Sequence, residues 1–228
     1  MSHYFITATD TDAGKTFISA NLLKSAARLG KKCFGFKPVA SGCEQTLEGL
    51  RNEDAVSLQQ AGSIALSYEQ VNLYQFVPAI APHIAARQAG VKIDLLKSIQ
   101  HYHGLIQKFK PDFSLVEGVG GWQVPLDDNI AIPDLAKQLD LAVVVVVKIK
   151  LGCINHALLT LNAIRSRGVP LKGWIANAVV EDEICRANVQ AIQERTEVPL
   201  LGKVSLHNMD VPDNSLMENE FNSLFSKL

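Results

Sequence analysis

A run of five consecutive valines, residues 143–147, limits the possible folds of this chain more than any other feature. A strand with one face in water alternates apolar and polar residues, whereas a strand buried on both faces is apolar throughout. Shorter β-branched or apolar runs recur along the chain and alternate with longer amphipathic stretches, which is typical of βαβ units. We therefore expect an α/β fold with a doubly wound, mainly parallel sheet of about seven strands and helices on both faces.

The expected strands occupy residues 4–7, 32–37, 112–117, 142–148, 173–178 and 200–204, and a further strand is expected somewhere within 66–76. Helices are predicted to begin near Thr16, Glu53, Ala81, Asp94, Ile132, Ile154 and Glu183. A polar tail after His207 precedes a short final helix. With 228 residues, the chain has the length of one α/β domain, so we expect a single P-loop domain over 1–228.

Composition argues against several classes of partner. Lys and Arg total 22 and Asp and Glu total 23, so the basic surplus of proteins that bind nucleic acid or anionic membranes is missing. The most apolar run, residues 141–147, is much shorter than the roughly 20 residues of a membrane span. The first residues lack the pattern of a signal peptide, and the four cysteines form no C-x-x-C pair. We expect a cytoplasmic protein without a nucleic-acid partner, a membrane partner or a zinc site.

A candidate phosphate-binding loop follows the first expected strand. Residues 8–16 read Ala-Thr-Asp-Thr-Asp-Ala-Gly-Lys-Thr and lead into an apolar helix. In a P-loop, the glycine lets backbone N–H groups approach phosphate, the lysine contacts the β- and γ-phosphates, and the hydroxyl reaches Mg²⁺. The standard spacing requires glycine at position 9, where Thr9 stands, so an ordinary helix start remains an alternative. The position between a strand and a helix favours nucleotide binding.

Charged residues also follow two other expected strands. Lys37 ends the second strand, and Glu117 ends the third strand at the position of a Walker-B carboxylate. In open α/β sheets ligands bind at the carboxyl ends of the strands. Asp54 lies at a helix start, where capping is the simpler role. Together with Thr16, the two carboxylates Asp54 and Glu117 suit Mg²⁺, which takes few protein ligands.

Six motifs in order along the chain resemble those of the dethiobiotin synthetase family, and they span roughly residues 4 to 204. They are Thr-Asp-Thr-Asp-Ala-Gly-Lys-Thr at 9–16, Lys-Pro-Val-Ala-Ser-Gly at 37–42, Ala-Pro-His at 81–83, Glu-Gly-Val-Gly-Gly-Trp at 117–122, Leu-Gly-Cys-Ile-Asn-His-Ala at 151–157 and Trp-Ile-Ala-Asn at 174–177. Each motif is weak alone, but their common order at strand ends makes the resemblance specific.

The resemblance implies a homodimeric ligase of biotin biosynthesis that uses ATP and Mg²⁺. Its small-molecule substrates are 7,8-diaminopelargonic acid and CO2. One amine captures CO2 as a carbamate, the carbamate oxygen attacks the γ-phosphate, and the second amine attacks the resulting mixed anhydride. The products are dethiobiotin, ADP and phosphate.

The resemblance also assigns roles to individual residues. The catalytic group is Thr11, Lys15 and Lys37. The nucleotide group is Asp12, Ala13, Gly14, Lys15, Thr16, Phe17, Glu117, Gly120 and Asn177. The substrate group is Thr11, Lys37, Ser41, Gly152, Cys153 and Asn155, and the Mg²⁺ ligands are Thr16, Asp54 and Glu117.

Two of these roles have a clear chemical basis. The amide of Asn177 carries a donor and an acceptor, so it can pair with adenine through both atoms. Residues 152–155 open a helix, and helix N-termini bind carboxylates; the family implies that this turn receives the carboxylate tail of the substrate from the partner subunit.

Ala8 departs from the family pattern, which has the first glycine of the loop at this position. Alanine resists positive φ at a cost of about 1 kcal/mol. We therefore expect weaker ATP binding, and we expect the substitution Ala8→Gly to lower the dissociation constant for ATP.

Three other functions share parts of this pattern. A regulatory P-loop ATPase of the partition or septum-positioning type usually carries a second lysine early in the loop, where this chain has Asp10 or Thr11. An amide-forming enzyme of the cobyrinate type usually carries a glutaminase domain, for which 228 residues leave no room. A non-catalytic binding module is disfavoured by the presence of Lys15, Lys37 and Glu117 together.

Overall fold

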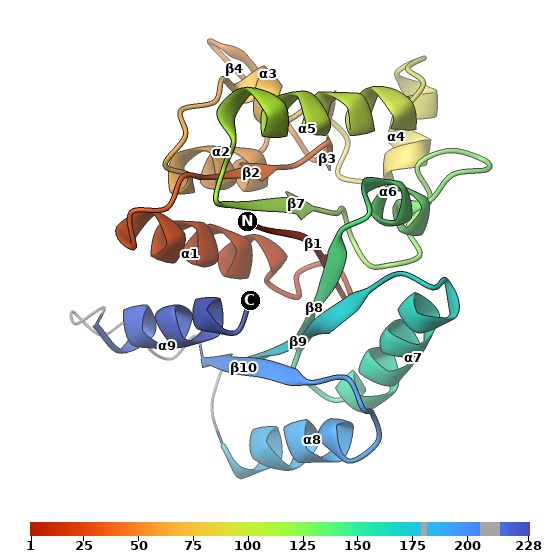
Figure 1. The fold of residues 1–228 in the computed structure, drawn as a ribbon. Coiled ribbons are helices and arrows are strands. Elements are labelled where there is room, and N and C mark those ends of the chain that lie inside the picture. The colour runs from red at the N-terminus through yellow and green to blue at the C-terminus, as the bar shows by residue number, and fades with distance from the viewer. Residues whose placement is uncertain (179–181, 206–214) are drawn as a thin grey trace.

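The computed structural model describes residues 1–178, 182–205 and 215–228, and its centre is a six-stranded parallel sheet (Figure 1). The strand order is β10-β9-β8-β1-β7-β2, and every neighbouring pair is parallel. The strands are β1 (Ser2–Ala8), β2 (Cys33–Phe36), β7 (Phe113–Glu117), β8 (Ala142–Lys148), β9 (Leu171–Ala178) and β10 (Leu200–Ser205). This arrangement confirms the expected doubly wound sheet, and six strands are close to the expected seven.

Helices cover both faces of the sheet. The successive β7 residues Phe113 and Ser114 show this: Phe113 packs on Phe225 of α9 (Ser215–Ser226), with ring centroids 4.9 Å apart, whereas Ser114 Oγ lies 2.8 Å from the hydroxyl of Tyr102 in α5 (Leu95–Phe109). Neighbouring residues of a strand point to opposite faces, so α9 and α5 lie on opposite sides. The helices α1 (Lys15–Arg28) and α2 (Glu53–Ala61) share the face of α9.

The remaining large helices lie on the face of α5. From β2 to β7, β8, β9 and β10 the chain moves across the sheet in one direction, so right-handed crossovers place the connecting helices on one face. These helices are α5, α6 (Ile132–Leu139), α7 (Cys153–Ser166) and α8 (Glu183–Gln193). The connection from β1 to β2 runs the other way, which puts α1 on the opposite face.

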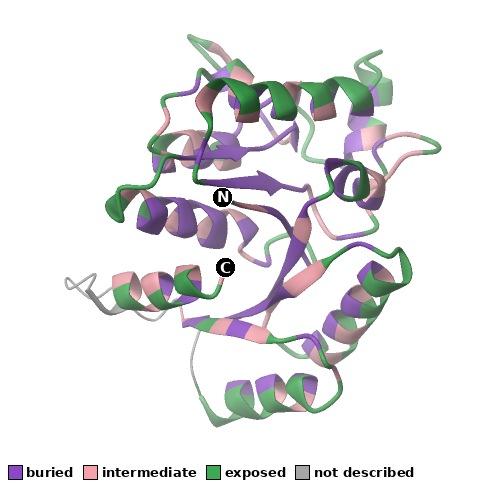
Figure 2. Cartoon of the chain, in the orientation of Figure 1, coloured by how far each residue is buried: buried purple, intermediate pink, exposed green. Residues whose placement is uncertain are grey.

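The valine run forms the centre of the core. All five valines from 143 to 147 are fully buried in β8, between β1 and β9. Figure 2 shows the buried residues concentrated along these central strands. The interpretation of this run as a strand covered on both faces is confirmed.

Short elements lie outside the central sheet. β3 (Val39–Ser41) pairs in parallel with β6 (Tyr74–Phe76), and β4 (Glu44–Thr46) pairs with β5 (Gly49–Arg51) in a hairpin. The stretch 66–76 thus contains a strand, as expected, but this strand pairs with β3 instead of joining the central sheet. The helices α3 (Tyr68–Val71) and α4 (Pro82–Gln88) complete this region.

Within the described ranges, no helix is long and apolar enough to cross a membrane. The final helix is present as α9, whereas the polar tail from 208 to 214 lies outside the described residues.

Candidate active site

Functional side chains gather where the parallel strands end. β1 ends at Ala8 and leads into the loop, Lys37 follows the last residue of β2, and Glu117 is the last residue of β7. Strand register brings these ends together, because Ile6 of β1 pairs with Glu117. On the other side of β1, Asn177 of β9 pairs with the last residue of β8. The predicted edge of the sheet is therefore the edge on which these residues lie.

The loop after β1 adopts a curved conformation that leads into α1. Asp12 has a φ of 55° and Gly14, the N-cap of α1, has a φ of 88°. A Cβ atom at Gly14 would lie 2.1 Å from the side-chain nitrogen of Asn177, so only glycine fits there. The loop thus presents the N-terminus of α1 to the cavity, as a phosphate-binding loop does.

The expected strain at Ala8 is absent. Among the described residues, the non-glycine residues with positive φ are Asp12, Lys110 and Asp140. Ala8 is instead the fully buried last residue of β1. The backbone argument for weaker ATP binding is therefore wrong, because the alanine at this position does not occupy a conformation that favours glycine.

Lys15 lies in a setting that opposes its positive charge. The residue is only 7% exposed, and its Nζ donates to the main-chain oxygen of Asp10 at 3.4 Å. Burial, and then the positive charge of Lys37, lower the pKa of Lys15 to about 8, although nearby carboxylates act in the opposite direction. An anionic ligand at the loop would stabilise the charged form of this lysine.

Lys37 connects the two carboxylates among the candidate metal ligands. Its Nζ donates to Glu117 Oε1 at 2.7 Å, to Asp54 Oδ2 at 3.0 Å and to the main-chain oxygen of Gly118 at 3.1 Å. The hydroxyl of Thr16 donates to the same Glu117 oxygen at 2.8 Å. Thr16, Lys37, Asp54 and Glu117 therefore form one network, from four separate elements or strand ends, around the buried Lys37 and Glu117.

The charges in this network shift one another's titration. Burial disfavours the ammonium of Lys37, but Glu117 and Asp54 outweigh that effect and hold the pKa of Lys37 above its ordinary value. Burial likewise opposes the charged form of Asp54, yet Lys37 keeps the pKa of that carboxyl below its ordinary value. Both groups are therefore charged at neutral pH.

The donor set suits a hard cation. Glu117 is completely buried, and its second oxygen, Oε2, has no hydrogen-bond partner among the described residues. Two carboxylates and the hydroxyl of Thr16 face one another here, and the described part of the chain contains no group of three or more His, Cys, Asp or Glu side chains placed to hold a metal. A cation at this site would take its other ligands from phosphate or water, which is the usual situation for Mg²⁺.

A cavity of about 560 Å³ lies above this network. Many of the predicted residues line it: Thr11, Asp12, Gly14, Lys15, Thr16, Phe17, Lys37, Ser41, Asp54 and Gly120. The buried hydroxyl of Ser41 has no partner in the described part of the chain, so it is available to a ligand. Ala40, Ala79, Ile80, Ala81, Pro82, Val119 and Val124 add an apolar wall, which suits a ligand with an alkyl chain.

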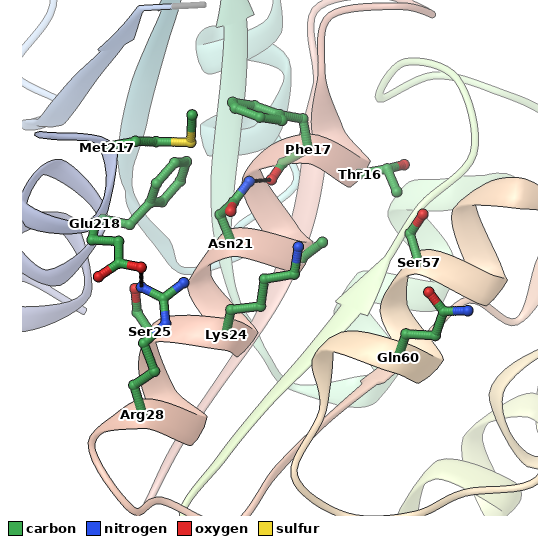
Figure 3. A pocket seen from close by; sticks show the side chains of 12 residues that line it. Thr16, Phe17, Asn21, Lys24, Ser25, Arg28, Ser57, Gln60, Met217 and Glu218 are labelled. Atoms are coloured by element: carbon green, nitrogen blue, oxygen red, sulfur yellow. Dashed lines mark hydrogen bonds and ion pairs between the residues drawn. The ribbon is translucent and has the colours of Figure 1, made fainter. Parts of the chain in front are cut away.

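A second cavity runs along α1 between α2 and α9, and Figure 3 shows its side chains. Its volume is about 520 Å³, and it meets the first cavity at Thr16 and Phe17. Arg28 and Glu218 form an ion pair of 3.2 Å across it. Of the residues that line this second cavity, only Thr16 and Phe17 have a predicted role. We therefore place the chemistry in the first cavity.

Asn177 contacts the phosphate loop itself. Its side-chain nitrogen donates to the main-chain oxygen of Ala13 at 2.8 Å, while its buried Oδ1 has no partner within the described residues. One of the two N–H groups of this amide is therefore in use, while its second N–H and its Oδ1 remain for a base.

The turn at the start of α7 lies apart from the first cavity. Gly152 and Asn155 are exposed, Cys153 is buried, and none of the three lines that cavity. Lys150, just before the turn, forms an ion pair of 3.6 Å with Asp10 of the phosphate loop. The turn therefore lies near the phosphate loop, but Gly152 and Asn155 remain exposed.

Two asparagines that support the site were not predicted to do so. Asn72 donates to the main-chain oxygen of Lys37 at 2.6 Å, and Asn52 donates to that of Ser41 at 3.2 Å. Asn52 also caps α2 and thereby orients Asp54. Its place before a helix start is a signal that the sequence contains, whereas nothing around Asn72 points to its partner.

Residues 2–209 match the AAA domain family. An ATP-dependent dethiobiotin synthetase of Chromohalobacter salexigens is 45% identical, with 93% of each chain covered. The enzyme of Pseudomonas paraeruginosa is 48% identical over 90% of each chain, and that of Pseudoalteromonas translucida is 41% identical over 96% of this chain and 98% of its own.

Solved structures with the same fold include cell division proteins. The MinD protein of Aquifex aeolicus has a TM-score of 0.64 at 15% identity and covers 100% of this chain and 96% of its own. The MinD protein of Pyrococcus furiosus has a TM-score of 0.59 at 17% identity, with 100% and 98% covered. Identity at this level shows a shared fold only, whereas the identities of 41–48% show the family. The chain belongs to the ATP-dependent dethiobiotin synthetase family of P-loop, AAA-domain proteins.

Proposed function

We propose that this chain closes the ureido ring of dethiobiotin from 7,8-diaminopelargonic acid and CO2 at the expense of ATP. The observation that carries the proposal is the network of Thr16, Lys37, Asp54 and Glu117 beside Lys15, under a cavity with one apolar wall. Such a network suits phosphoryl transfer to a substrate with an alkyl chain. Since ATP is made and used in the cytoplasm, we expect the reaction there.

The proposed reaction has three steps. A neutral amine of the substrate adds to CO2 and loses a proton, which leaves a carbamate. A carbamate oxygen then attacks the γ-phosphorus, and the bond to ADP breaks. Finally the second amine attacks the carbonyl carbon of the mixed anhydride, loses a proton and expels phosphate, which closes the ring.

The two lysines stabilise the charge that moves in the second step. Lys15 extends along the phosphate loop to the main-chain oxygen of Asp10, and both Lys15 and Lys37 line the cavity. Fixed positive charge in a site with little water lowers the barrier to phosphoryl transfer, and the loss of one such donor typically costs about 10²–10³ in rate. Thr11 and the partnerless hydroxyl of Ser41 would hold the carbamate or the diamine, and Asp12, which lines the same cavity, would lie near the amines.

Nucleotide contacts come from the loop and from the strand ends. Residues 12–17 would supply backbone N–H groups and the side chains of Lys15 and Thr16. Gly120 lines the same cavity, and Asn177 would offer its free oxygen to the base. Mg²⁺, held by Thr16, Asp54 and Glu117, would neutralise charge on the transferring phosphoryl group.

We further propose that two copies of the chain form a dimer through the face of α7. Leu151 is fully exposed and Leu159 is 62% exposed, and Leu159 lines a depression of about 540 Å³ shared with residues 9–11 and 121–124. Exposed apolar side chains beside a site are typical of an interface. In such a dimer, Gly152, Cys153 and Asn155 of one copy bind the carboxylate tail of a substrate held by the other. Sedimentation as a monomer at assay concentration would count against this part.

The test is an assay that follows dethiobiotin and phosphate together by mass spectrometry. With 7,8-diaminopelargonic acid, bicarbonate and Mg·ATP present, both products should form in equal amounts and neither should form without the diamine. ATP hydrolysis that does not respond to the diamine would instead indicate a regulatory ATPase.

A further inference from the structure

Lys37 and a metal ion would need the same two carboxylates, Asp54 and Glu117. The ammonium of Lys37 has three hydrogens, and three acceptors lie within 3.1 Å of it: Glu117 Oε1, Asp54 Oδ2 and the oxygen of Gly118. Two of these acceptors belong to the carboxylates assigned to Mg²⁺. In this arrangement Lys37 has no hydrogen left for a phosphate or a carbamate.

The side chain of Lys37 can change position, whereas its backbone is fixed by hydrogen bonds. Its main-chain N–H donates to Val71 at 2.8 Å, and its main-chain oxygen accepts from Asn72 at 2.6 Å, so both ends of the residue are fixed. The side chain has four rotatable bonds, and the cavity that contains Thr11 and Ser41 lies directly beside it. Nζ is therefore able to leave the carboxylates for the cavity without movement of the backbone.

The charges favour such an exchange only when phosphate is present. Lys37 already forms ion pairs with Asp54 at 3.0 Å and with Glu117 at 2.7 Å, and Lys15 lines the same cavity. A divalent cation alone would add two positive charges beside both lysines, whereas a cation that arrives with nucleotide brings negative charge for the released ammonium to meet.

We propose that Lys37 is an internal counter-ion that competes with the metal for Asp54 and Glu117, and that binding of metal with nucleotide transfers its ammonium to the reacting phosphate and carbamate. This inference rests on the metal ligands named under the proposed function. The position of Lys37 then depends on whether the metal site is filled. The charge of Lys37 reaches the substrate only when the metal is present.

The test compares metal binding without turnover. Free Mn²⁺, a hard cation visible by electron paramagnetic resonance, is titrated into the wild type, into Lys37→Met and into Lys24→Met, which removes an equal charge from the exposed face of α1. Without nucleotide, Lys37→Met should bind Mn²⁺ about tenfold more tightly than either of the other proteins, because the competitor is gone. An affinity equal to or weaker than that of the wild type would overturn the proposal.

A second measurement uses the wild type and does not depend on how the variant folds. In protein with ¹⁵N-labelled lysine, the resonance of the Lys37 ammonium is assigned by its loss in Lys37→Arg. Addition of Mg²⁺ with a non-hydrolysable ATP analogue should shift this resonance beyond the shift caused by the analogue alone. A resonance that is unchanged by saturating Mg²⁺ would contradict the exchange.

Neither measurement requires the diamine, so the two proposals fail separately. Dethiobiotin formation without the Mn²⁺ effect would overturn the exchange and leave the function in place. The Mn²⁺ effect without dethiobiotin formation would overturn the function and leave the exchange in place.

Discussion

The two halves of the proposed site differ in how completely one chain builds them. At the phosphate half, the fully buried Glu117 joins Thr16 and Lys37 by bonds of 2.7–2.8 Å. At the start of α7, Gly152 and Asn155 are exposed and Leu151 beside them is fully exposed. The first half is held in place by hydrogen bonds within the chain, whereas the second half has the exposure expected of a surface that a second copy completes.

The largest expected effect falls on the organised half. Lys37→Gln should lower turnover by at least about 10²–10³-fold while sparing ATP binding, because the lost charge acts on the transferring phosphoryl group more than on bound ATP. Rates of dethiobiotin formation and the dissociation constant for ATP are measured in parallel with Lys24→Gln, which should resemble the wild type. Turnover near the wild-type rate would remove Lys37 from the mechanism.

A smaller effect is expected at the metal ligands. Glu117→Gln should raise the Mg²⁺ concentration needed for half-maximal activity by about tenfold or more, since an amide replaces a charged ligand. The matched control is Glu53→Gln, an exposed carboxylate next to Asp54. If the Mg²⁺ titration of Glu117→Gln is unchanged, Glu117 is a structural residue.

A charge placed on the α7 face tests the half of the site at the start of α7. Leu159→Glu should weaken the dimer and raise the KM for the diamine by about tenfold, with a smaller effect on the KM for ATP, because burial of an unpaired charge in an interface is unfavourable. Ile184→Glu makes the same change at a residue of α8 that is 72% exposed and serves as the control. Sedimentation gives the assembly state. A dimer with unchanged kinetics would place the substrate tail elsewhere.

Proton uptake provides a finer test of the organised half. The pKa of Lys15 is lowered to about 8, so near that pH part of the population is neutral, and bound phosphates raise the pKa again. ATP binding near pH 8 should therefore take up a fraction of a proton, and affinity should fall as the pH rises above this value. Calorimetry in buffers with different ionisation enthalpies measures the uptake. Lys15→Met should abolish it, and an equal uptake in that variant would assign the proton to another group.

The smallest effect is expected at Ala8. Since Ala8 does not have a positive φ, Ala8→Gly should leave the dissociation constant for ATP unchanged and lower stability by about 0.5–1 kcal/mol through backbone entropy. ATP titration and thermal unfolding of the two proteins are compared. Clearly tighter ATP binding by the glycine variant would restore the original interpretation of this position.

The sequence predicted the positions of those site residues that lie at the ends of strands. The valine run identified a strand buried on both faces, and parallel pairing then requires the loop after β1, Lys37 and Glu117 to meet at one edge. No pattern of this kind covers β3 to β6, because strands of three residues are too short to show a period. In addition, β3 and its partner β6 are about 35 residues apart.

Side-chain partners were less predictable than positions. The sequence indicates that Lys37, Asp54 and Glu117 lie near one another, but not that the lysine bonds to both carboxylates, because that depends on distances of a few tenths of an ångström. The bond from Asn177 to Ala13 and the φ of Ala8 are likewise properties of the packed loop. The expectation about Ala8 relied on the role of a motif and not on its local geometry.

The central claim is that a carbamate oxygen attacks ATP, and isotope transfer tests it most directly. The enzyme is given bicarbonate labelled with oxygen-18, 7,8-diaminopelargonic acid and unlabelled Mg·ATP, and the products are analysed before the label exchanges with water. The account predicts one labelled oxygen in the phosphate for each dethiobiotin, and one in the ring carbonyl. Phosphate without label, formed alongside dethiobiotin, would contradict it.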